Sequence, residues 1–306
     1  MPKRTKAFIA LFIVSAIWGI AAVVIKQTLN YIPPITFLYI RFLFASIILY
    51  FFVDWKKSNY KKIIKSKKFI YIFLLGVLGS TVNLGLIFYA LKYTTAIEGT
   101  IIYAANPIWI IIGGMLFLKE KVTKKEILGI MLTLVGFALV VLSPMFHIEL
   151  EKTSSIFGNF LMLLAALSWA AYSLLSKNVF NHDKTGKRYS PMFITFITFF
   201  AGAVTLAPFS IYEILTTEIN YIASFGGIFY MVIFSSVIAY WLYEYGVQKM
   251  EVSEAGLFQY IEPLFTIPVA IIFIGERFYF VYIIGGIITA LGLYVAEKHP
   301  SVRFSK

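Results

Sequence analysis

Long apolar runs separated by short polar segments dominate the pattern along this chain. Ten of these runs have about the 20 residues that an α-helix needs to cross a bilayer. They cover residues 7–25, 35–53, 69–91, 97–118, 127–143, 156–176, 191–212, 222–247, 255–274 and 278–296. The connections between them are too short to form a soluble domain. The pattern therefore predicts an all-α polytopic membrane protein with ten transmembrane helices.

The composition supports this fold class. Hydrophobic residues make up 60% of the 306 residues and charged residues only 14%. Soluble domains have roughly 45–50% apolar and about 25% charged residues, so this chain lacks the charge to cover a surface that faces water. The composition thus excludes ordinary soluble enzymes, disordered proteins and coiled coils.

The net charge of +12 is explained by topology. If the amino terminus lies inside, the inner segments hold 22 of the lysines and arginines and the outer segments hold four. Cytoplasmic loops carry such an excess of positive charge. We therefore expect a multi-pass protein of the cell membrane with both termini in the cytoplasm, embedded in the lipid bilayer and with no nucleic-acid partner.

The second half of the chain repeats features of the first. Trp18 and Lys26 reappear as Trp169 and Lys177, at an offset of 151 residues. Five further pairs share an offset of 156: Glu98 with Glu254, Pro107 with Pro263, Glu120 with Glu276, Gly129 with Gly285, and Gly136 with Gly292. The halves are expected to span residues 1–150 and 151–306. Each holds five runs, so the second copy is inverted in the membrane, an arrangement typical of secondary transporters.

The combination of ten runs and these matched residues resembles a known family. The residues on which the resemblance rests are Trp18-Gly19, Arg41-Phe42, Pro107, Glu120, Gly129, Gly136, Glu262-Pro263, Gly275-Glu276, Gly285 and Gly292. The chain is similar to EamA-type members of the drug/metabolite transporter superfamily, which are built from two five-helix EamA repeats. The resemblance implies alternating-access transport, usually export, of small metabolites such as amino acids or related compounds. It does not supply the substrate.

Two prolines stand at matched positions inside predicted spans. A proline within a helix removes one backbone hydrogen bond and frees the carbonyl four residues earlier. Pro107 would free the carbonyl of Tyr103, and Pro263 that of Gln259. Irregular backbone at membrane depth is tolerated where it is buried in protein or lines a cavity. The two helix breaks either line a site or only shape the packing.

Glu262 is the most informative candidate, because it lies near the middle of its run. A charged side chain at the bilayer centre costs about 2.5–3.5 kcal/mol on insertion scales, and such residues are functional by default. Gln259 and Thr266 lie on the same helical face. This face suits a substrate amine or a transported proton. The alternative is that Glu262 is a structural partner of Arg41.

Further candidates for substrate binding surround these two. Asn106 and Tyr103 occupy in the first repeat the places that Glu262 and Gln259 occupy in the second, so the chemistry of the halves differs. Arg41 lies within the second run. It could attract a carboxylate, pair with Glu262 or Glu98, or extend toward the interface. The other candidates are aromatic: Trp18, Trp169 and Tyr172.

Several small and acidic residues have structural interpretations. Neighbouring glycines predict close helix contacts at Gly76 with Gly79, Gly113 with Gly114, and Gly285 with Gly286. Glu120 and Glu276 end their runs on opposite sides of the membrane and are interpreted as boundaries of the repeats or as gates.

Other function classes find less support. The chain has no cysteine, its three histidines fall in polar stretches, and it has no HExxH motif or phosphate-binding loop. These absences speak against a membrane-embedded enzyme and predict no cofactor and no bound metal. A channel would favour a repeated polar stripe, which the sequence does not show. We expect a monomeric transporter whose partners are a small molecule and a coupled proton.

Overall fold

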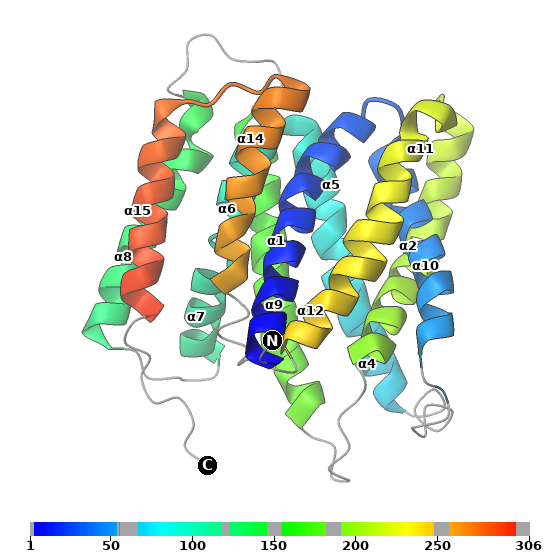
Figure 1. Cartoon of the computed structure of the whole chain (residues 1–306), viewed down its shortest axis with the longest axis horizontal. Helices are drawn as coiled ribbons and strands as arrows, with labels where there is room; N and C mark the ends of the chain where they lie inside the picture. Colours follow the sequence, from blue (N-terminus) through cyan, green and yellow to red (C-terminus); the bar gives the residue numbers. More distant parts are fainter. Residues whose placement is uncertain are drawn as a thin grey trace.

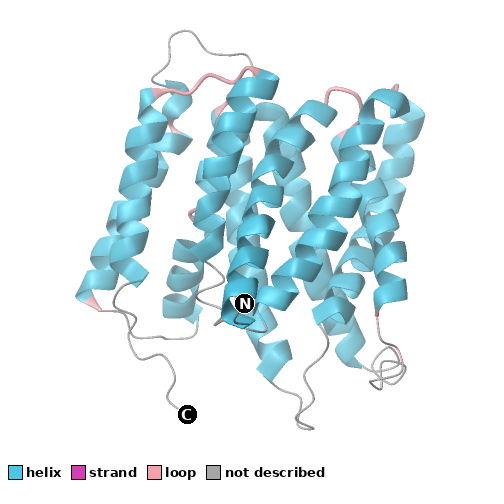
Figure 2. Ribbon diagram, in the orientation of Figure 1, coloured by secondary structure: helices cyan, strands magenta, loops and turns pink. Residues whose placement is uncertain are grey.

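The described part of the chain is a bundle of helices that lie side by side. The computed structural model describes residues 3–53, 55, 67–117, 123–145, 155–181, 191–247 and 257–297. Within these ranges every regular element is a helix (Figures 1 and 2). The predicted all-α class is confirmed.

The first half of the chain begins with two uninterrupted helices and continues with two interrupted ones. Its elements are α1 (Lys3–Thr28), α2 (Pro34–Phe52), α4 (Lys67–Val77), the π-helix η1 (Leu78–Val82), α5 (Asn83–Tyr93), α6 (Ala96–Tyr103), α7 (Asn106–Phe117), α8 (Lys124–Val141) and the 3-10 turn η2 (Ser143–Met145). Here α4, η1 and α5 follow one another without a gap, whereas α6 and α7 are separated by a two-residue turn.

The second half follows the same plan. Its elements are α9 (Ile156–Asn181), α10 (Pro191–Thr216), α11 (Tyr221–Phe229), the π-helix η3 (Tyr230–Ile238), α12 (Ala239–Val247), the 3-10 helix η4 (Leu257–Ile261), α14 (Glu262–Ile274) and α15 (Phe280–Glu297). In both halves, the third long helical segment thus contains a π-helix (α4-η1-α5 and α11-η3-α12). The fourth segment is broken in both halves, between α6 and α7 and between η4 and α14. Residues 78–82 correspond to 234–238 at the repeat offset of 156.

Seven helices of the described part are long and apolar enough to cross a membrane. They are Arg4–Thr28, Pro34–Phe52, Phe69–Tyr93, Ala96–Phe117, Ile156–Leu175, Met192–Thr216 and Tyr221–Tyr243. Two shorter apolar helices are Glu262–Ile274 and Phe280–Val295. The 18-residue α8 begins with the charged run Lys124, Lys125 and Glu126. Several membrane crossings are therefore confirmed, and the number ten stays a prediction.

The bundle has an apolar exterior as well as an apolar core. Phe37, Phe42, Phe88 and Phe199 are fully buried and form part of the main core. Many large apolar side chains are instead exposed, among them Ile222 at 93%. Water would disfavour such a surface and hydrocarbon would not, so the exposed residues mark the surface that lipid covers.

Matched glycines bring the last helices of the two halves into close contact. A Cβ atom on Gly136 of α8 would lie 2.6 Å from the Thr289 nitrogen of α15. A Cβ on Gly292 of α15 would lie 2.4 Å from the Thr133 nitrogen of α8. Only a residue without a side chain allows backbones to approach so closely in a membrane. The repeat pair Gly136 and Gly292 therefore joins α8 to α15.

The predicted glycine contacts are found at four of the positions. A Cβ on Gly76 would lie 3.0 Å from the Thr198 Cα of α10, and one on Gly285 would lie 2.6 Å from Val140. Gly79 packs against the ring of Tyr172 and Gly113 against Leu174. Gly286 differs from the expectation, because no atom of a described residue lies within 4 Å of its Cβ position. Its side of α15 is not used for helix packing.

Candidate functional site

Both halves restart a helix one residue before a matched proline. In the first half, α6 ends at Tyr103 and α7 begins at Asn106, so Pro107 is the second residue of the new helix. In the second half, η4 leads into α14, which begins at Glu262, and Pro263 is its second residue. A proline is well accommodated in the first turn of a helix, where its missing N–H has no partner to lose. The two prolines therefore stand at breaks and not within continuous helices.

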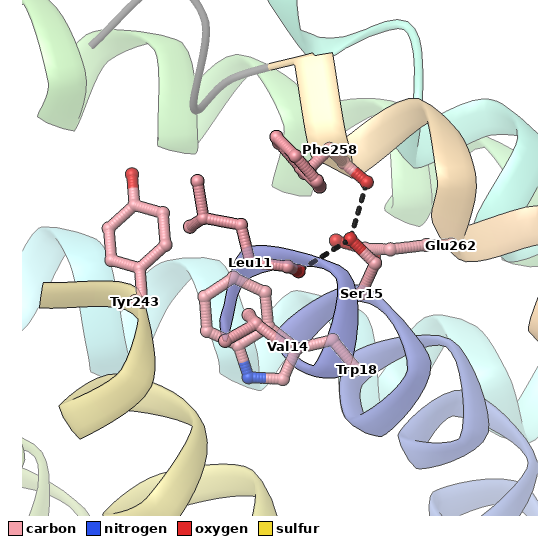
Figure 3. A pocket seen from close by; sticks show the side chains of 7 residues that line it. All are labelled: Leu11, Val14, Ser15, Trp18, Tyr243, Phe258 and Glu262. Atoms are coloured by element: carbon pink, nitrogen blue, oxygen red, sulfur yellow. Dashed lines mark hydrogen bonds between the residues drawn. The ribbon is translucent and has the colours of Figure 1, made fainter. Parts of the chain in front are cut away.

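Glu262 lines a small pocket between α1, α12 and the η4–α14 segment. The residues around it are Leu11, Val14, Ser15, Trp18, Tyr243, Phe258 and Glu262 (Figure 3). The cavity has a volume of about 10 Å³, close to the least that can hold one water molecule and far below the roughly 300–1,000 Å³ of sites for drug-sized ligands. In the state described here the pocket marks a position beside Glu262 and has no room for a substrate.

The Glu262 carboxylate has no hydrogen bond or ion pair to any described residue, and its side chain is partly accessible. Around it, Ser15 donates to the Phe258 carbonyl at 2.7 Å and to the Leu11 carbonyl at 3.1 Å (Figure 3). These bonds fix the wall of the pocket and leave the carboxylate available. An ionisable group that faces a cavity at membrane depth, without a protein partner, is suited to bind a cationic group or a proton.

Glu262 was predicted to share one helical face with Gln259 and Thr266, but Thr266 does not line the pocket. Thr266 is buried, and its hydroxyl donates to the Gly19 carbonyl of α1 at 2.7 Å. A Cβ on Gly19 would lie 2.5 Å from the Glu262 carbonyl, so α1 and α14 are in direct backbone contact. Gln259 lies in η4, and its side chain is outside the described part of the structure.

Trp18 connects this pocket to the π-helix η3. Its indole nitrogen donates to the Ser235 carbonyl at 3.2 Å. Its ring lies 5.5 Å from the rings of both Tyr240 and Tyr243 on α12. Trp18 thus lines the Glu262 pocket and also belongs to an aromatic group with Tyr240 and Tyr243 of α12.

Arg41 lies buried at the other side of this aromatic group. Only 3% of its surface is exposed. Its Nε donates to the Ser236 hydroxyl at 2.8 Å and its Nη2 to the Ser235 hydroxyl at 3.4 Å. Both serines belong to η3, and π-helical segments occur frequently at functional sites.

Arg41 has no acidic partner among the described residues. The Glu98 carboxylate, one predicted partner, instead accepts hydrogen bonds from the hydroxyls of Thr94, Thr95 and Ser143. Glu262, the other, makes no ion pair in the described part of the chain. A buried charge is costly unless it is paired. The Ser235 and Ser236 hydroxyls of η3 accept some of the hydrogen bonds that the Arg41 guanidinium can donate. They carry no negative charge, so no described residue compensates the positive charge of Arg41.

Tyr103 and Asn106 form a second buried polar group, next to the break between α6 and α7. The Tyr103 hydroxyl donates to the Asn83 Oδ1 atom at 3.3 Å, and the Asn83 amide donates to the Ala165 carbonyl at 2.7 Å. Asn106 is fully buried, and its amide has no hydrogen-bond partner among the described residues. Neither Tyr103 nor Asn106 is among the residues that line the Glu262 pocket.

Trp169 and Tyr172 lie elsewhere. Their rings pack against each other 5.3 Å apart on α9, and Tyr172 covers Gly79 of η1. Neither residue lines the Glu262 pocket. Trp18 and Trp169 occupy matched positions in the repeats, but only Trp18 reaches that pocket.

Several polar residues of this region were missed in the sequence, namely Ser15, Asn83, Ser235, Ser236, Tyr240 and Tyr243. The signal was present for three of them, because Asn83 and the Ser235-Ser236 pair interrupt long apolar runs. Polar groups in such runs often join helices by hydrogen bonds. The aromatic residues gave no such signal among the many in the chain.

The EamA-like transporter family matches this chain twice, over residues 5–142 and 156–297. The two matches cover most of the chain, one in each half. The chain belongs to the EamA-like transporter family. This membership confirms the predicted resemblance and the presence of two EamA repeats, and it identifies the bundle as that of a membrane transporter family.

Related proteins carry corresponding names. An uncharacterized transporter of Archaeoglobus fulgidus is 27% identical over 97% of this chain and 99% of its own length. An uncharacterized transporter of Bacillus subtilis is 29% identical over 96% and 94%. A probable amino-acid metabolite efflux pump of Salmonella typhimurium is 22% identical over 96% and 95%. All three align with this EamA-like chain over nearly its whole length.

A solved crystal structure shares the fold. It covers 96% of this chain and 97% of its own, with a TM-score of 0.63 and 16% sequence identity. At this identity the likeness concerns the fold alone. It shows that the helical arrangement of this EamA-like chain also occurs in an experimentally determined structure.

Proposed function

We propose that this EamA-like protein is a secondary transporter that exports small metabolites of the amino-acid class by alternating access. It crosses the membrane ten times as a monomer, with inverted halves and both termini in the cytoplasm. The observation that carries the proposal is the pair of uncompensated charges in one polar region, the Glu262 carboxylate and the Arg41 guanidinium.

The two charges suit the two ends of a zwitterion. A substrate amine would bind the Glu262 carboxylate, and a substrate carboxylate would bind Arg41, whose planar guanidinium matches that group. Trp18 lines the Glu262 pocket and its ring lies 5.5 Å from that of Tyr240, and these rings would contact the remainder of the substrate. The probable amino-acid metabolite efflux pump among the relatives supports this substrate class.

Proton coupling at Glu262 is the companion proposal. A carboxylate that binds either a substrate amine or a proton exchanges one cation for the other, which couples export to the proton gradient. The alternatives, a channel and a membrane-embedded enzyme, find less support. The described residues contain no cluster of three or more His, Asp or Glu that could hold a metal ion.

Transport by the purified protein in proteoliposomes tests the proposal. Liposomes preloaded with an unlabelled amino acid should take up the labelled one by exchange, with saturation kinetics. Glu262→Gln should slow the exchange at least about tenfold, equivalent to about 1.4 kcal/mol. The matched control is Glu218→Gln, because Glu218 is exposed and remote from the pocket. Flux that rises linearly with concentration would indicate a channel instead.

The substrate analogues give a second arm of this test. A compound that keeps the amine but lacks the carboxylate should compete weakly with the amino acid in the wild-type protein. In Arg41→Gln the two compounds should compete about equally, because the carboxylate no longer has a cationic partner. An unchanged preference in that variant would remove Arg41 from substrate recognition.

The topology is tested separately. The chain has no cysteine, so a single introduced cysteine reports without background. Lys306→Cys should react with a membrane-impermeant maleimide only from the cytoplasmic side. Labelling from outside would contradict ten crossings with an inner amino terminus.

A further inference from the structure

Two carboxylates of the second half hold two helices of the first half by their amino termini. Glu276 follows α14 and accepts the backbone N–H groups of Ala96 and Ile97 at 2.7 and 3.1 Å. These are the first two residues of α6. The first four N–H groups of a helix lack partners inside the helix and carry partial positive charge, so a carboxylate there makes strong, charge-assisted bonds.

Glu213 of α10 makes the same kind of contact with α2. Its Oε2 accepts the Thr36 N–H at 2.7 Å and the Thr36 hydroxyl at 2.9 Å, and its Oε1 accepts the Ile35 N–H at 3.4 Å. Thr36 and Ile35 lie in the first turn of α2. Glu213 and Glu276, which we call the latch carboxylates, thus each join the two halves of the chain.

The local sequence explains how Glu276 reaches its position. Gly275 has a φ of 68°, in the left-handed region that glycine adopts without strain. It ends α14, and the Glu276 N–H turns back to the Ala270 carbonyl at 3.2 Å. Such a turn is a common end of a helix and sets the direction of the residue that follows. Glu276 is 6% exposed, so its carboxylate is held between the halves.

The latch carboxylates and the Glu262 pocket lie toward opposite ends of the bundle. The loop that carries Glu276 is at the upper end in Figure 1, and the amino terminus is at the lower end. Leu11 and Ser15 line the pocket from the first half of α1. Lys26, in the last turn of α1, donates to the Leu91 and Thr94 carbonyls, and Thr94 lies two residues before α6. At a rise of about 1.5 Å per residue, Ser15 and Lys26 are separated by about 16 Å along the helix.

We infer that Glu213 and Glu276 are positioning residues of the transport cycle, which keep the end away from the amino terminus closed in the state described here. The inference rests on the proposed alternating-access function. When the halves rotate against each other, both carboxylates must release α2 and α6 before that end can open. Their contacts therefore bias the equilibrium toward the state described here, in which the pocket adjoins the other end.

Single-cysteine labelling tests this without knowledge of the substrate. Tyr243→Cys reports on the pocket, because Tyr243 lines it and is partly exposed. Ile32→Cys reports on the opposite end, because Ile32 lies between α1 and α2 and is 2% exposed. Each is placed in the wild-type background and in the double variant Glu213→Gln, Glu276→Gln. The double variant should label at Ile32→Cys at least about fivefold faster and at Tyr243→Cys correspondingly slower, as expected for a coupled two-state change.

Opposite changes of the two labelling rates distinguish carboxylates that control the two-state equilibrium from carboxylates that only stabilise the local fold. If the carboxylates only stabilised the local fold, Ile32→Cys would label faster and Tyr243→Cys would keep its rate, and the inference would be overturned. Glu218→Gln is the matched control, because Glu218 lies near the end of α10, is exposed, and makes no hydrogen bond to a described residue. It should leave both rates unchanged. If the double variant does not fold, Glu213→Gln alone carries the same comparison.

A cross-link provides an independent measurement. The side chains of Thr36 and Glu213 touch, so Thr36→Cys with Glu213→Cys can be joined by a short bifunctional thiol reagent that contains a reducible bond. Joined protein in proteoliposomes should not transport, and reduction should restore the rate of the unjoined variant. Equal transport before and after reduction would overturn the inference. A wrong substrate class would instead abolish transport in every sample, wild type included, and leave the labelling result intact.

Discussion

The two repeats build the same helix break and place different chemistry on it. In the first repeat, Asn106 begins α7 ahead of Pro107, and in the second, Glu262 begins α14 ahead of Pro263. Asn106 is fully buried, whereas Glu262 is partly accessible and lines a pocket. The backbone thus follows the repeat, and one substitution at a matched position decides which break can bind a charged group.

The π-helices show the same division. In the first repeat, the Ser80 hydroxyl of η1 donates to the Gly76 and Thr198 carbonyls at 2.6 and 3.0 Å, which joins η1 to α10. In the second repeat, Ser236 of η3 corresponds to Ser80 and accepts from Arg41 of α2. The matching helix contact is held by neutral hydrogen bonds in one half and contains a buried cation in the other.

The largest expected effect comes from removing the charge that distinguishes the two breaks. Glu262→Gln keeps the size of the side chain and should reduce transport at least about tenfold, and it should flatten the pH dependence of the rate. Asn106→Ala should change transport much less. Transport at two pH values, normalised to folded protein, measures both. Wild-type rates and an unchanged pH profile in Glu262→Gln would contradict a role for this residue.

Arg41→Gln should have the next largest effect, a loss of about tenfold in transport. Folded yield should change little or rise, because the change removes a buried charge with no acidic partner among the described residues. Thr198→Val is the counterpart in the other half, where only the Thr198 backbone carbonyl is bonded to η1. It should retain transport. A severe loss of folded Arg41→Gln with normal specific activity would assign Arg41 to structure.

Removing the prolines should have a moderate effect. Pro263→Ala permits α14 to continue into η4 and should reduce transport roughly three- to tenfold with near-normal membrane insertion. Pro107→Ala should reduce it less, because the matching break carries no charged group. Pro268→Ala is the control on α14, since Pro268 lies farther along that helix and faces outward. Full transport in Pro263→Ala would reduce this break to a packing feature.

The smallest effect on specific transport is expected where the two halves are alike. Gly136→Ala and Gly292→Ala each bring a Cβ within 2.6 Å of backbone on the other helix. Each should lower the stability by about 1–3 kcal/mol, as overpacking does, with little change in the activity of the folded fraction. Gly286→Ala on α15 should be neutral, because no atom of a described residue lies within 4 Å of its Cβ position. Thermal unfolding in detergent measures the three variants.

The fold class followed from the sequence because its physical cause is local. A bilayer requires that backbone groups bond within a segment, so a long apolar run can only be a helix. The repeat offset of 156 predicted that Pro107 and Pro263, and Gly136 and Gly292, would occupy equivalent places. The intramembrane carboxylate Glu262 also stands out in the sequence, since its cost depends only on its depth in the apolar run.

The composition of the site could not be read in the same way. The sequence offered Glu98 and Glu262 as partners for Arg41, whereas the structure gives it Ser235 and Ser236, about 195 residues away along the chain. It also grouped Trp169 with Trp18 by symmetry, although Trp169 lies apart from the pocket. Contacts of this kind depend on how helices from the two halves pack against each other.

The sequence by itself determined a helical membrane protein made of two similar halves, because hydropathy and repeat spacing act within a single segment. Only the tertiary structure decided which polar groups satisfy each other. Glu98, Glu213 and Glu276 are bound by hydroxyls or backbone N–H groups, whereas Glu262 has no hydrogen-bond partner among the described residues. A carboxylate is available to a ligand only when no neighbouring helix supplies a donor, and the packing of distant segments sets that condition.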